Sequence, residues 1–544
     1  MGSDRRLKHW GWGYEDQQPG PAELAEAALA IRERLGFGGE PVPPVLADEI
    51  VLPAPRLDPA IGPDGLFSAD HHDRLVHGLG KAYRDVVRGY RGTFEHPPDL
   101  VAFPGDAEEV AQVLSVAADA EAAVVPFGGG TSVVGGVEPR LPEGDDRPVI
   151  SLDLTGLDRV LEIDRESLAA RIQSGMRGPA LEDRLREEGL TLRHYPQSFE
   201  YSTLGGWIAT RAGGHFATGE THIDDLVESV TALTPSGEWA SRRLPGSGAG
   251  PSPDRLLIGS EGTLGVITES WVRVRPRPSY RASATVTFPD FTAAATGAVR
   301  EIVQARLNPG NCRLIDPLEA ETMMAGDGSS ALLLLGFESD AVPVGDRLDE
   351  AVEIARSHGG SLASRRDIGG EGEDRSDDPS GAERWRGAFL MAPYLRDTLV
   401  ICGVLSETFE TAITWDRFEA FVNQVMEETR DAVARVSPGP GPPRVSCRLT
   451  HVYPDGAAPY FTVLAPAVRG GEVEQWDEIK AAASEAILGA GGTITHHHAV
   501  GRDHRPWYDR QRPDVFAAAL AGAKQGVDPA GLLNPGVLLD PPGP

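Results

Sequence analysis

The sequence feature that most constrains this chain is a glycine cluster that directly follows an apolar segment. The stretch reads Val124-Val125-Pro126-Phe127-Gly128-Gly129-Gly130-Thr131-Ser132-Val133-Val134-Gly135-Gly136. Glycine has no Cβ, so its backbone N–H groups can come close to an anion. The cluster suits a pyrophosphate, and the alternative is a glycine-rich surface turn. It is not a Walker loop, because no Lys follows the glycines, and its spacing differs from the G-x-G-x-x-G dinucleotide fingerprint.

Length and charge narrow the classes of protein to which the chain can belong. Its 544 residues are enough for roughly three domain-sized units. The sequence has 51 basic and 81 acidic residues, which gives a net charge of −30. We therefore expect no nucleic acid as a partner, because Lys and Arg bind phosphate backbones. An anionic substrate would need a local basic pocket, so Arg residues within apolar segments become candidates.

The remaining compositional signals favour a cytoplasmic protein. The first residues lack an apolar signal segment, and the sequence has no apolar run of about eighteen residues. Cys312, Cys402 and Cys447 are widely spaced and form neither a disulfide framework nor a zinc pattern. A reducing compartment suits such a chain.

The pattern of apolar segments divides the chain into four parts. Residues 1–90 read as a mostly helical region. Residues 91–277 alternate short strands with helices around the glycine cluster, as in α/β units. Residues 278–490 suggest an antiparallel sheet with helices on one face. Residues 491–544 carry a run of three histidines and are expected to pack back on the α/β part. The predicted fold class is therefore α+β.

Two arginines stand out in the second half of the chain. Arg313 lies in an otherwise apolar predicted strand, and Arg396 follows an apolar run. A buried guanidinium fork suits an anion such as a phosphate. The alternative is an ion pair with a nearby acid, Asp316 or Asp397.

The histidine run and one tyrosine are candidates for proton transfer. His496, His497 and His498 would alternate between faces on a strand, so one or two imidazoles could face a pocket. The run could instead form a metal site or a structural turn. No carboxylate or Cys lies at ligand spacing beside it, so we expect no metal. Tyr460 could assist proton transfer or pack in the core.

Several motifs occur in an order that resembles FAD-binding flavoproteins of the vanillyl-alcohol oxidase type. They are Pro126–Gly136, Pro196–Ser198, Ser202–Trp207, Gly259–Glu269 and Asp528–Gly536. More particularly, the chain resembles the alkyldihydroxyacetonephosphate synthase family. The segments that carry this resemblance are Trp10–Tyr14, Arg313–Asp316, Tyr394–Asp397, Glu407–Thr411, Trp415–Arg417, Cys447–Thr450 and Gly491–Gly501. The resemblance implies a two-lobed α/β FAD-binding domain and a cap domain with an antiparallel sheet and helices.

The resemblance also implies site residues. Non-covalent FAD would be held by Pro126, Phe127, Gly128, Gly129, Gly130, Thr131, Ser132, Pro196, Ser198, Ser202, Gly205, Gly206, Thr210, Arg211, Glu261, Gly262, Gly265, Val266 and Ile267. Thr203 would lie near the reactive ring of the flavin. Arg313 and Arg396 would bind the substrate. The other catalytic residues would be Tyr460, His496, His497 and His498.

The family's reaction exchanges the acyl chain of acyl-dihydroxyacetone phosphate for a long-chain fatty alcohol, which makes an ether lipid precursor. The resemblance implies that reduced flavin N5 bonds to the substrate carbon during this exchange. We also expect a homodimer. An amphiphilic substrate comes from lipid, so peripheral contact with a membrane is expected, although no basic amphipathic helix is evident.

One stretch departs from the family pattern, and a rival function shares the scaffold. Residues 213–222 replace a more basic stretch that ends in Tyr-Gly, so the substrate is less constrained than the flavin. His215 in this stretch could touch the flavin.

The rival is an FAD-dependent 2-hydroxy-acid dehydrogenase or oxidase of the D-lactate or glycolate type. Such enzymes typically carry His-x-Gly-Asp-Gly-Asn-x-His and Glu-His-Gly segments. Here His451–Gly456 lacks the second histidine and His497–Gly501 lacks the glutamate.

Overall fold

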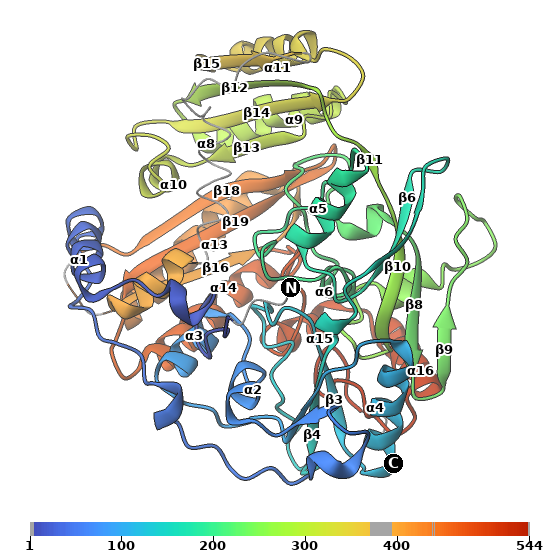
Figure 1. Ribbon diagram of the computed structural model, residues 1–544. Helices are drawn as coiled ribbons and strands as arrows, with labels where there is room; N and C mark the ends of the chain where they lie inside the picture. Colours follow the sequence, from blue (N-terminus) through green and yellow to red (C-terminus); the bar gives the residue numbers. More distant parts are fainter. Residues whose placement is uncertain (1–4, 370–393, 438, 440, 542–544) are drawn as a thin grey trace.

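The computed structural model describes residues 5–369, 394–437, 439 and 441–541. The chain forms a mixed α and β structure in which a large antiparallel sheet lies beside two smaller sheets (Figure 1). No helix in the described part of the chain has the length and apolar character that a membrane span requires.

The glycine cluster follows a strand at the edge of a four-stranded sheet. The elements of this layer are β1 (Phe67–Ser68), β2 (Leu100–Ala102), β3 (Ala123–Phe127), β4 (Val149–Asp153) and helix α4 (Ala107–Asp119). The strand order is β1-β2-β4-β3, and β2 and β3 run parallel to β4. Asp106 caps α4, because its carboxylate accepts from the Glu109 N–H at 3.0 Å. Val110, Val113, Leu114 and Ala117 then form the buried stripe of the helix.

A five-stranded antiparallel sheet follows in the sequence. Its elements and neighbours are β5 (Val160–Asp164), β6 (Ala169–Gln173), α5 (Gly178–Glu187), β7 (Leu190–Thr191), α6 (Leu204–Thr210), β8 (Val227–Thr234), β9 (Gly237–Ala240), α7 (Asp254–Leu257), β10 (Val266–Arg273) and β11 (Arg275–Pro276). The strand order is β5-β6-β10-β8-β9, and β7 pairs with β11 separately. Helix α6 packs against β6 and β10, which places its N-terminus beside the glycine cluster.

The large sheet is antiparallel throughout, with the order β15-β12-β14-β13-β18-β19-β16 and with β17 paired to β19. Its strands are β12 (Tyr280–Phe288), β13 (Asn311–Ile315), β14 (Ala331–Ser339), β15 (Ser361–Ile368), β16 (Val404–Glu410), β17 (Ile413–Thr414), β18 (Arg444–Val452) and β19 (Gly456–Pro466). Cys312 and Leu314 of β13 face the main hydrophobic core, and Arg313 between them points to the opposite face. The period-two alternation of a strand thus puts an arginine on the side away from the core.

Helices cover the core face of this sheet. They are α8 (Phe291–Ala294), the π-helical turn η6 (Ala295–Val299), α9 (Arg300–Gln304), α11 (Gly345–Ser357), α13 (Phe418–Val436) and α14 (Glu472–Gly489). The short helix α10 (Pro317–Thr322) packs on the other face, where Ala320 meets Ile315 and Leu334. Residues 394–401 form a further helical segment.

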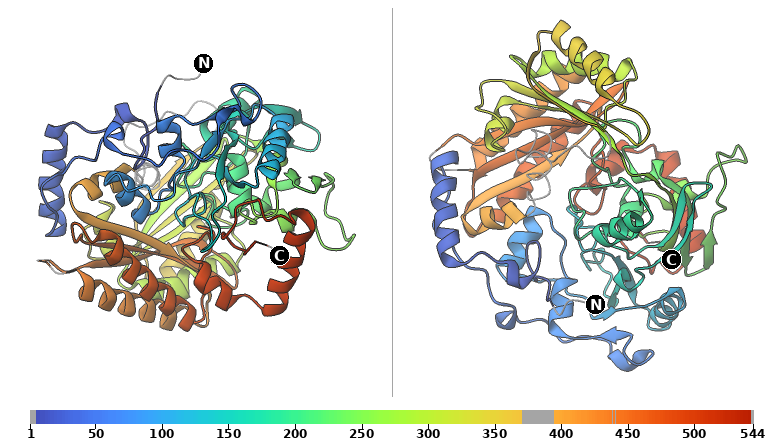
Figure 2. Two further views of the ribbon diagram at one scale, coloured as in Figure 1. Left: turned by 90° about the horizontal axis from the view of Figure 1, so that it is seen from below. Right: turned by 45° about the horizontal axis from the view of Figure 1, so that its top comes forward.

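The N-terminal part wraps around both halves (Figure 2). It contains α1 (Pro21–Leu35), α2 (His71–Val76) and α3 (Tyr83–Tyr90). The aromatic arm at the front is buried, because Trp10 is 3% exposed and its ring centroid lies 5.5 Å from that of Tyr90. Trp12 is buried as well.

The C-terminal segment returns to the smaller sheets through α15 (Arg505–Gln511) and α16 (Asp514–Val527). The Val124 N–H in β3 donates to the Leu532 carbonyl at 2.8 Å. Buried Lys524 donates to the carbonyls of Thr263 and Leu533, each at 2.7 Å, and to the Asp528 carboxylate at 2.6 Å. One lysine therefore ties the end of the chain to the α/β part.

Replacing Lys524 by Met should lower the free energy of unfolding by about 3–5 kcal/mol, because Asp528 would be left as an unpaired buried charge. Chemical unfolding followed by circular dichroism measures the loss. The control is Arg510→Met, which removes an exposed pair with Glu485 and should change the stability far less, because water and salt screen such a pair. Equal effects of the two changes would contradict the anchoring role of Lys524.

Candidate active site

A cavity of about 270 Å³ lies between the glycine cluster and the large sheet. One wall comes from the cluster, the N-terminus of α6 and residues 196–198. The other wall comes from β13, β18, β19 and the histidine run. The cavity thus brings together most of the predicted site residues, namely Gly128, Gly129, Gly130, Thr131, Ser132, Pro196, Ser198, Ser202, Thr203, Gly206, Thr210, Arg313, Arg396, Tyr460, His497 and His498.

The other predicted site residues do not line this cavity. They are Pro126, Phe127, Gly205, Arg211, Glu261, Gly262, Gly265, Val266, Ile267 and His496. Gly205 is pressed against Ser174, and Gly262 against Pro126. His215 also lies outside the cavity lining and packs on Tyr195. Direct contact of these residues with a flavin stays a prediction.

The glycine cluster is shaped by close contact with residues 201–203. A Cβ on Gly129 would lie 1.9 Å from the Tyr201 carbonyl oxygen, and one on Gly128 would lie 2.4 Å from the Thr203 hydroxyl. Gly130 has a φ of +65°, where a side chain is strained. Glycine is therefore required here by packing as well as by conformation.

The same cluster leaves backbone donors available beside the cavity. Among the described residues, the N–H groups of residues 128–132 donate none of the recorded hydrogen bonds. Buried N–H groups normally have partners, so a row of unpaired donors next to a cavity fits an anion such as a pyrophosphate. Thr203 supports the wall, because its Oγ1 accepts from the Gly206 N–H at 3.3 Å and caps α6.

Three guanidinium groups line the opposite wall of the cavity. Arg313 donates to the His215 carbonyl at 3.0 Å. Burial, together with the charge of Arg448, lowers the pKa of Arg313 to about 9. Arg396 donates to the Lys81 carbonyl at 3.2 Å and to the Thr408 hydroxyl at 3.3 Å. An anion placed here would relieve the repulsion between buried cations.

Arg448 was not among the sequence candidates, although its motif carried the family resemblance. It pairs with buried Glu319 and donates to the Thr462 hydroxyl at 3.2 Å. Its guanidinium carbon lies 3.9 Å from the centroid of the Tyr460 ring. A polar residue in the apolar stretch of a predicted strand was the available signal, the same one that identified Arg313.

The two acids proposed as alternative partners for the arginines have other bonds. Asp316 accepts from the backbone N–H groups of Glu319 and Cys447, each at 2.6 Å. Asp397 accepts from the Trp12 N–H at 2.8 Å and from Lys8 at 3.3 Å. Asp397 therefore fixes the aromatic arm next to Arg396.

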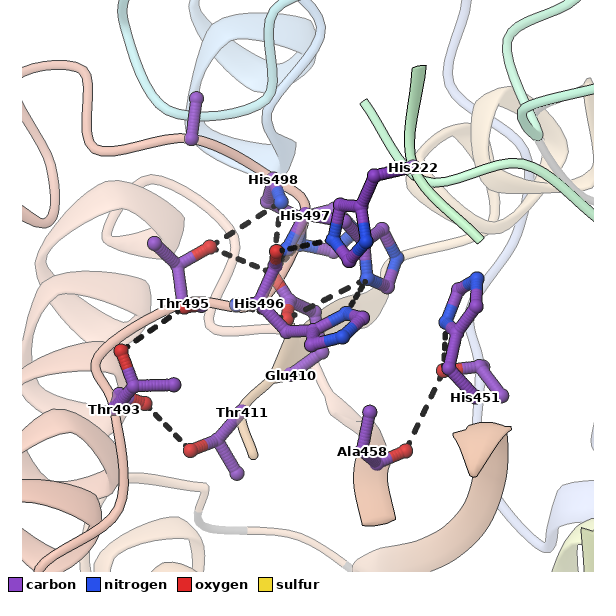
Figure 3. Close-up of polar contacts among 12 residues, drawn as sticks. His222, Glu410, Thr411, His451, Ala458, Thr493, Thr495, His496, His497 and His498 are labelled. Atoms are coloured by element: carbon purple, nitrogen blue, oxygen red, sulfur yellow. Dashed lines mark hydrogen bonds and ion pairs between the residues drawn. The ribbon is translucent and has the colours of Figure 1, made fainter. Parts of the chain in front are cut away.

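Of the conformations left open for the histidine run, the structure shows a turn and not a strand. Residues 496–498 form a bend that is held by one buried carboxylate, Glu410 of β16 (Figure 3). This carboxylate accepts from the N–H groups of His496, His497 and His498 at 2.5, 3.2 and 2.8 Å. Successive N–H groups of a strand point to opposite sides, so a strand could not direct all three at one acceptor.

Glu410 is fully buried and still ionised. Burial alone would raise its pKa, but the nearby His498 and His496 and the hydrogen bonds from Thr495 and the backbone lower that pKa to about 2. The Thr495 hydroxyl donates at 2.7 Å. Near neutral pH the imidazoles are uncharged, so the hydrogen bonds then contribute most of this stabilisation.

The imidazoles of the run are poor at holding a proton. Burial, with a contribution from neighbouring imidazoles, lowers the pKa of His496 and of His497 well below the ordinary value. Burial also lowers the pKa of His498 and raises that of Tyr460. The ring centroids of Tyr460 and His498 are 5.6 Å apart. Near neutral pH this group can therefore accept a proton and pass it on.

The fold brings to the histidines a carboxylate that the neighbouring sequence lacks. Ligand-type atoms of Glu410, His497 and His498 lie within 4.8 Å of one another, as do those of His451, His496 and His497. The sequence did not link Glu410 to the histidines, because Glu410 lies far from them along the chain. Several of these atoms already have partners, since His496 Nδ1 lies 3.0 Å from His497 Nδ1, and Glu410 accepts from the backbone. We interpret the cluster as a hydrogen-bonded network.

Comparisons with known proteins identify the family. Residues 98–241 match the FAD binding domain, and residues 277–538 match the C-terminal domain of FAD linked oxidases. The alkyldihydroxyacetonephosphate synthase of Caenorhabditis elegans is 32% identical over 497 residues, which cover 87% of this chain and 81% of that protein. This chain belongs to the alkyldihydroxyacetonephosphate synthase family. FAD is its cofactor.

Further matches agree with this assignment. The alkyldihydroxyacetonephosphate synthase of Dictyostelium discoideum is 29% identical over 86% of this chain and 77% of that protein. A solved structure of an alkyldihydroxyacetonephosphate synthase superposes with a TM-score of 0.79 over 97% of this chain and 98% of that one, at 24% identity. The synthase fold is thus the fold of this chain, and it includes the FAD-binding and cap arrangement that the sequence implied.

Gly129→Ala should abolish FAD uptake, because the new Cβ would collide with the Tyr201 carbonyl and move the cluster. Flavin absorbance of the purified protein, per mole of chain, measures this loss. Gly248→Ala is the control, since a Cβ there has nothing within 4 Å. Normal flavin content in Gly129→Ala would contradict the assignment of the cluster.

The contribution of Glu410 to stability should depend on pH. The folded-state pKa is depressed from 4.5 to about 2, so the stabilisation is present above the ordinary pKa and is lost as the pH falls through the folded one. Unfolding of the wild type and of Glu410→Gln, measured from pH 7 to pH 2, should show a difference that shrinks at the acid end. A difference that is constant with pH, or one matched by exposed Glu419→Gln, would exclude this role.

Proposed function

We propose that this protein is an alkyldihydroxyacetonephosphate synthase that exchanges the acyl chain of acyl-dihydroxyacetone phosphate for a long-chain fatty alcohol. One observation carries the proposal. A single cavity joins the glycine cluster to three guanidinium groups in a chain whose net charge is −30. An acidic chain that concentrates cations at one buried site is built to hold an anion there, and the substrate phosphate is a dianion.

The far end of the cavity suits an alkyl chain. Met323, Leu395, Leu399 and Leu464 line it. Leu399 and Leu464 belong to a small apolar cluster with Leu35 and Phe37. An amphiphilic substrate would then place its phosphate at the guanidinium groups and its hydrocarbon along this apolar end, where each buried methylene contributes about 0.8 kcal/mol.

The side chains of this site have separable roles. Bound FAD supplies the isoalloxazine ring that the family's chemistry requires, and residues 128–132 would hold its pyrophosphate. Arg313, Arg396 and Arg448 fix the phosphorylated end, which orients the reacting carbon. Tyr460, His497 and His498 accept and return protons at the substrate carbon and the alcohol oxygen.

Several finer points belong to the same proposal. FAD is held without a covalent bond, the protein is a homodimer, and it is cytoplasmic and touches membrane surfaces to collect its lipid substrate. The domains are 1–90, 91–277, 278–490 and 491–544. Thr203 lies near the reactive ring of the flavin, and His496 belongs to the catalytic residues.

The test is an assay of the purified FAD-loaded protein with palmitoyl-dihydroxyacetone phosphate and labelled hexadecanol. Labelled ether and free palmitate should form in equal amounts without oxygen consumption. Absence of ether together with dye reduction by D-lactate or glycolate would favour the 2-hydroxy-acid oxidoreductase instead.

Arg396→Ala should lower kcat/KM for ether synthesis by about 100-fold or more, since each hydrogen bond to a charged group contributes about 1.5–3 kcal/mol. Flavin content should stay unchanged. The control is Arg365→Ala, which removes an exposed guanidinium outside the cavity. Turnover of Arg396→Ala within twofold of the wild type would overturn its role in binding the phosphate.

A further inference from the structure

A continuous chain of hydrogen bonds leads from the cavity to the protein surface. It starts at His497, which lines the cavity and whose Nδ1 lies 3.0 Å from His496 Nδ1. His496 Nε2 lies 2.8 Å from the Tyr453 hydroxyl. That hydroxyl lies 3.1 Å from Thr221 Oγ1, which in turn lies 3.1 Å from His222 Nδ1. Every link joins groups that can both donate and accept.

One further bond fixes the direction of this chain. His222 Nε2 lies 3.1 Å from the His496 carbonyl oxygen (Figure 3). A carbonyl only accepts, so His222 carries its proton on Nε2 and its Nδ1 accepts from the Thr221 hydroxyl. Thr221 then accepts from Tyr453, and Tyr453 accepts from His496 Nε2–H. His496 Nδ1 is left to accept from His497 Nδ1–H. All donors therefore point outward, from the cavity toward His222.

The surroundings of the chain suit proton transfer. Thr221 is 2% exposed, whereas His222 and Tyr453 are half-buried. Burial raises the pKa of the Tyr453 hydroxyl, so this group stays protonated and passes a proton only by accepting one while giving one up. Asp225 is exposed, and its carboxylate accepts from the backbone N–H of His222 at 3.2 Å. The outer end of the chain therefore lies beside an exposed acidic side chain.

The neighbouring imidazole of His451 stays outside the chain. Its Nε2 lies 3.1 Å from the Gly214 carbonyl, and its Nδ1 lies 3.1 Å from the Thr450 hydroxyl. Its ring centroid is 4.9 Å from that of His496. Both of its nitrogens are thus engaged, and it forms a wall beside the chain.

The proposed reaction needs such an exit. An acyl ester and an alcohol give an ether and a carboxylic acid, and the acid ionises near neutral pH. The ester C–O bond at the substrate carbon breaks, the new C–O bond to the alcohol oxygen forms, and the alcohol proton is left over. One proton per turnover must therefore leave a buried site in which cationic arginines disfavour its retention.

We propose that His497, His496, Tyr453, Thr221 and His222 form a proton relay that carries this proton from the cavity to the surface. The proposal rests on the synthase activity proposed above. The outer members, Thr221 and His222, lie in the 213–222 stretch, where this chain departs from the family pattern. The relay gives that stretch a role in proton exit, separate from substrate recognition.

The first experiment breaks one link without changing the shape of the site. Thr221→Val removes the hydroxyl, and kcat for ether synthesis should fall about tenfold or more, with KM for both substrates within twofold of the wild type. Thr221→Ser should restore kcat, because it restores the hydroxyl. The control is Thr218→Val in the same loop, whose hydroxyl donates to the Pro309 carbonyl outside the relay, and its kcat should stay within twofold.

Unchanged kcat in Thr221→Val, or an equal loss in Thr218→Val, overturns the relay. A second experiment does not depend on turnover. NMR of protein labelled with ¹⁵N in its 14 histidines should find His222 and His496 protonated on Nε2 and His497 on Nδ1. The opposite tautomer at His496 overturns the relay even when ether forms. If no ether forms in the wild type, the proposed function fails, and the tautomers still decide whether the outward chain exists.

Discussion

The site depends on buried carboxylates that capture the backbone of the C-terminal segment. Glu410 accepts from the N–H groups of three successive histidines. Glu261 accepts from Val500 and Gly501, and Asp528 accepts from Leu532 and Leu533. Each carboxylate replaces lost water with several N–H donors. Irregular backbone of the C-terminal segment can therefore be buried between the smaller sheets and the large sheet. A regular strand or helix would not direct the same side chains into the cavity.

This arrangement separates two kinds of charge. Buried acids in the walls are satisfied by backbone donors and by lysine, whereas the cavity itself is lined by three guanidinium groups. Arg448 is balanced by Glu319, whereas burial and the charge of Arg448 lower the pKa of Arg313. The cavity thus gathers positive charge in a chain whose net charge is −30. Burial keeps the imidazoles beside these cations uncharged near neutral pH.

Local signals in the sequence predicted the local structure well. The glycine cluster after β3 and the strand that carries Arg313 both depend on neighbours a few residues away. The partners of Glu410 and Arg448 could not be found in this way, because Glu410 binds residues 85 to 88 positions further on and Arg448 pairs with a residue 129 positions earlier. Arg448 itself carried the same local signal as Arg313, a polar residue in an apolar predicted strand. The conformation of the histidine run stayed open for the same reason, since the carboxylate that bends it lies far away along the chain.

The most direct test of this account is a titration of the FAD-loaded protein that follows the flavin absorption spectrum. Dihydroxyacetone phosphate and unphosphorylated dihydroxyacetone are added separately at low and at high salt. The account predicts that only the phosphorylated ketone perturbs the flavin, because the guanidinium groups hold its phosphate in the cavity beside the cofactor. Equal perturbation by both ligands, or none by either, would contradict it.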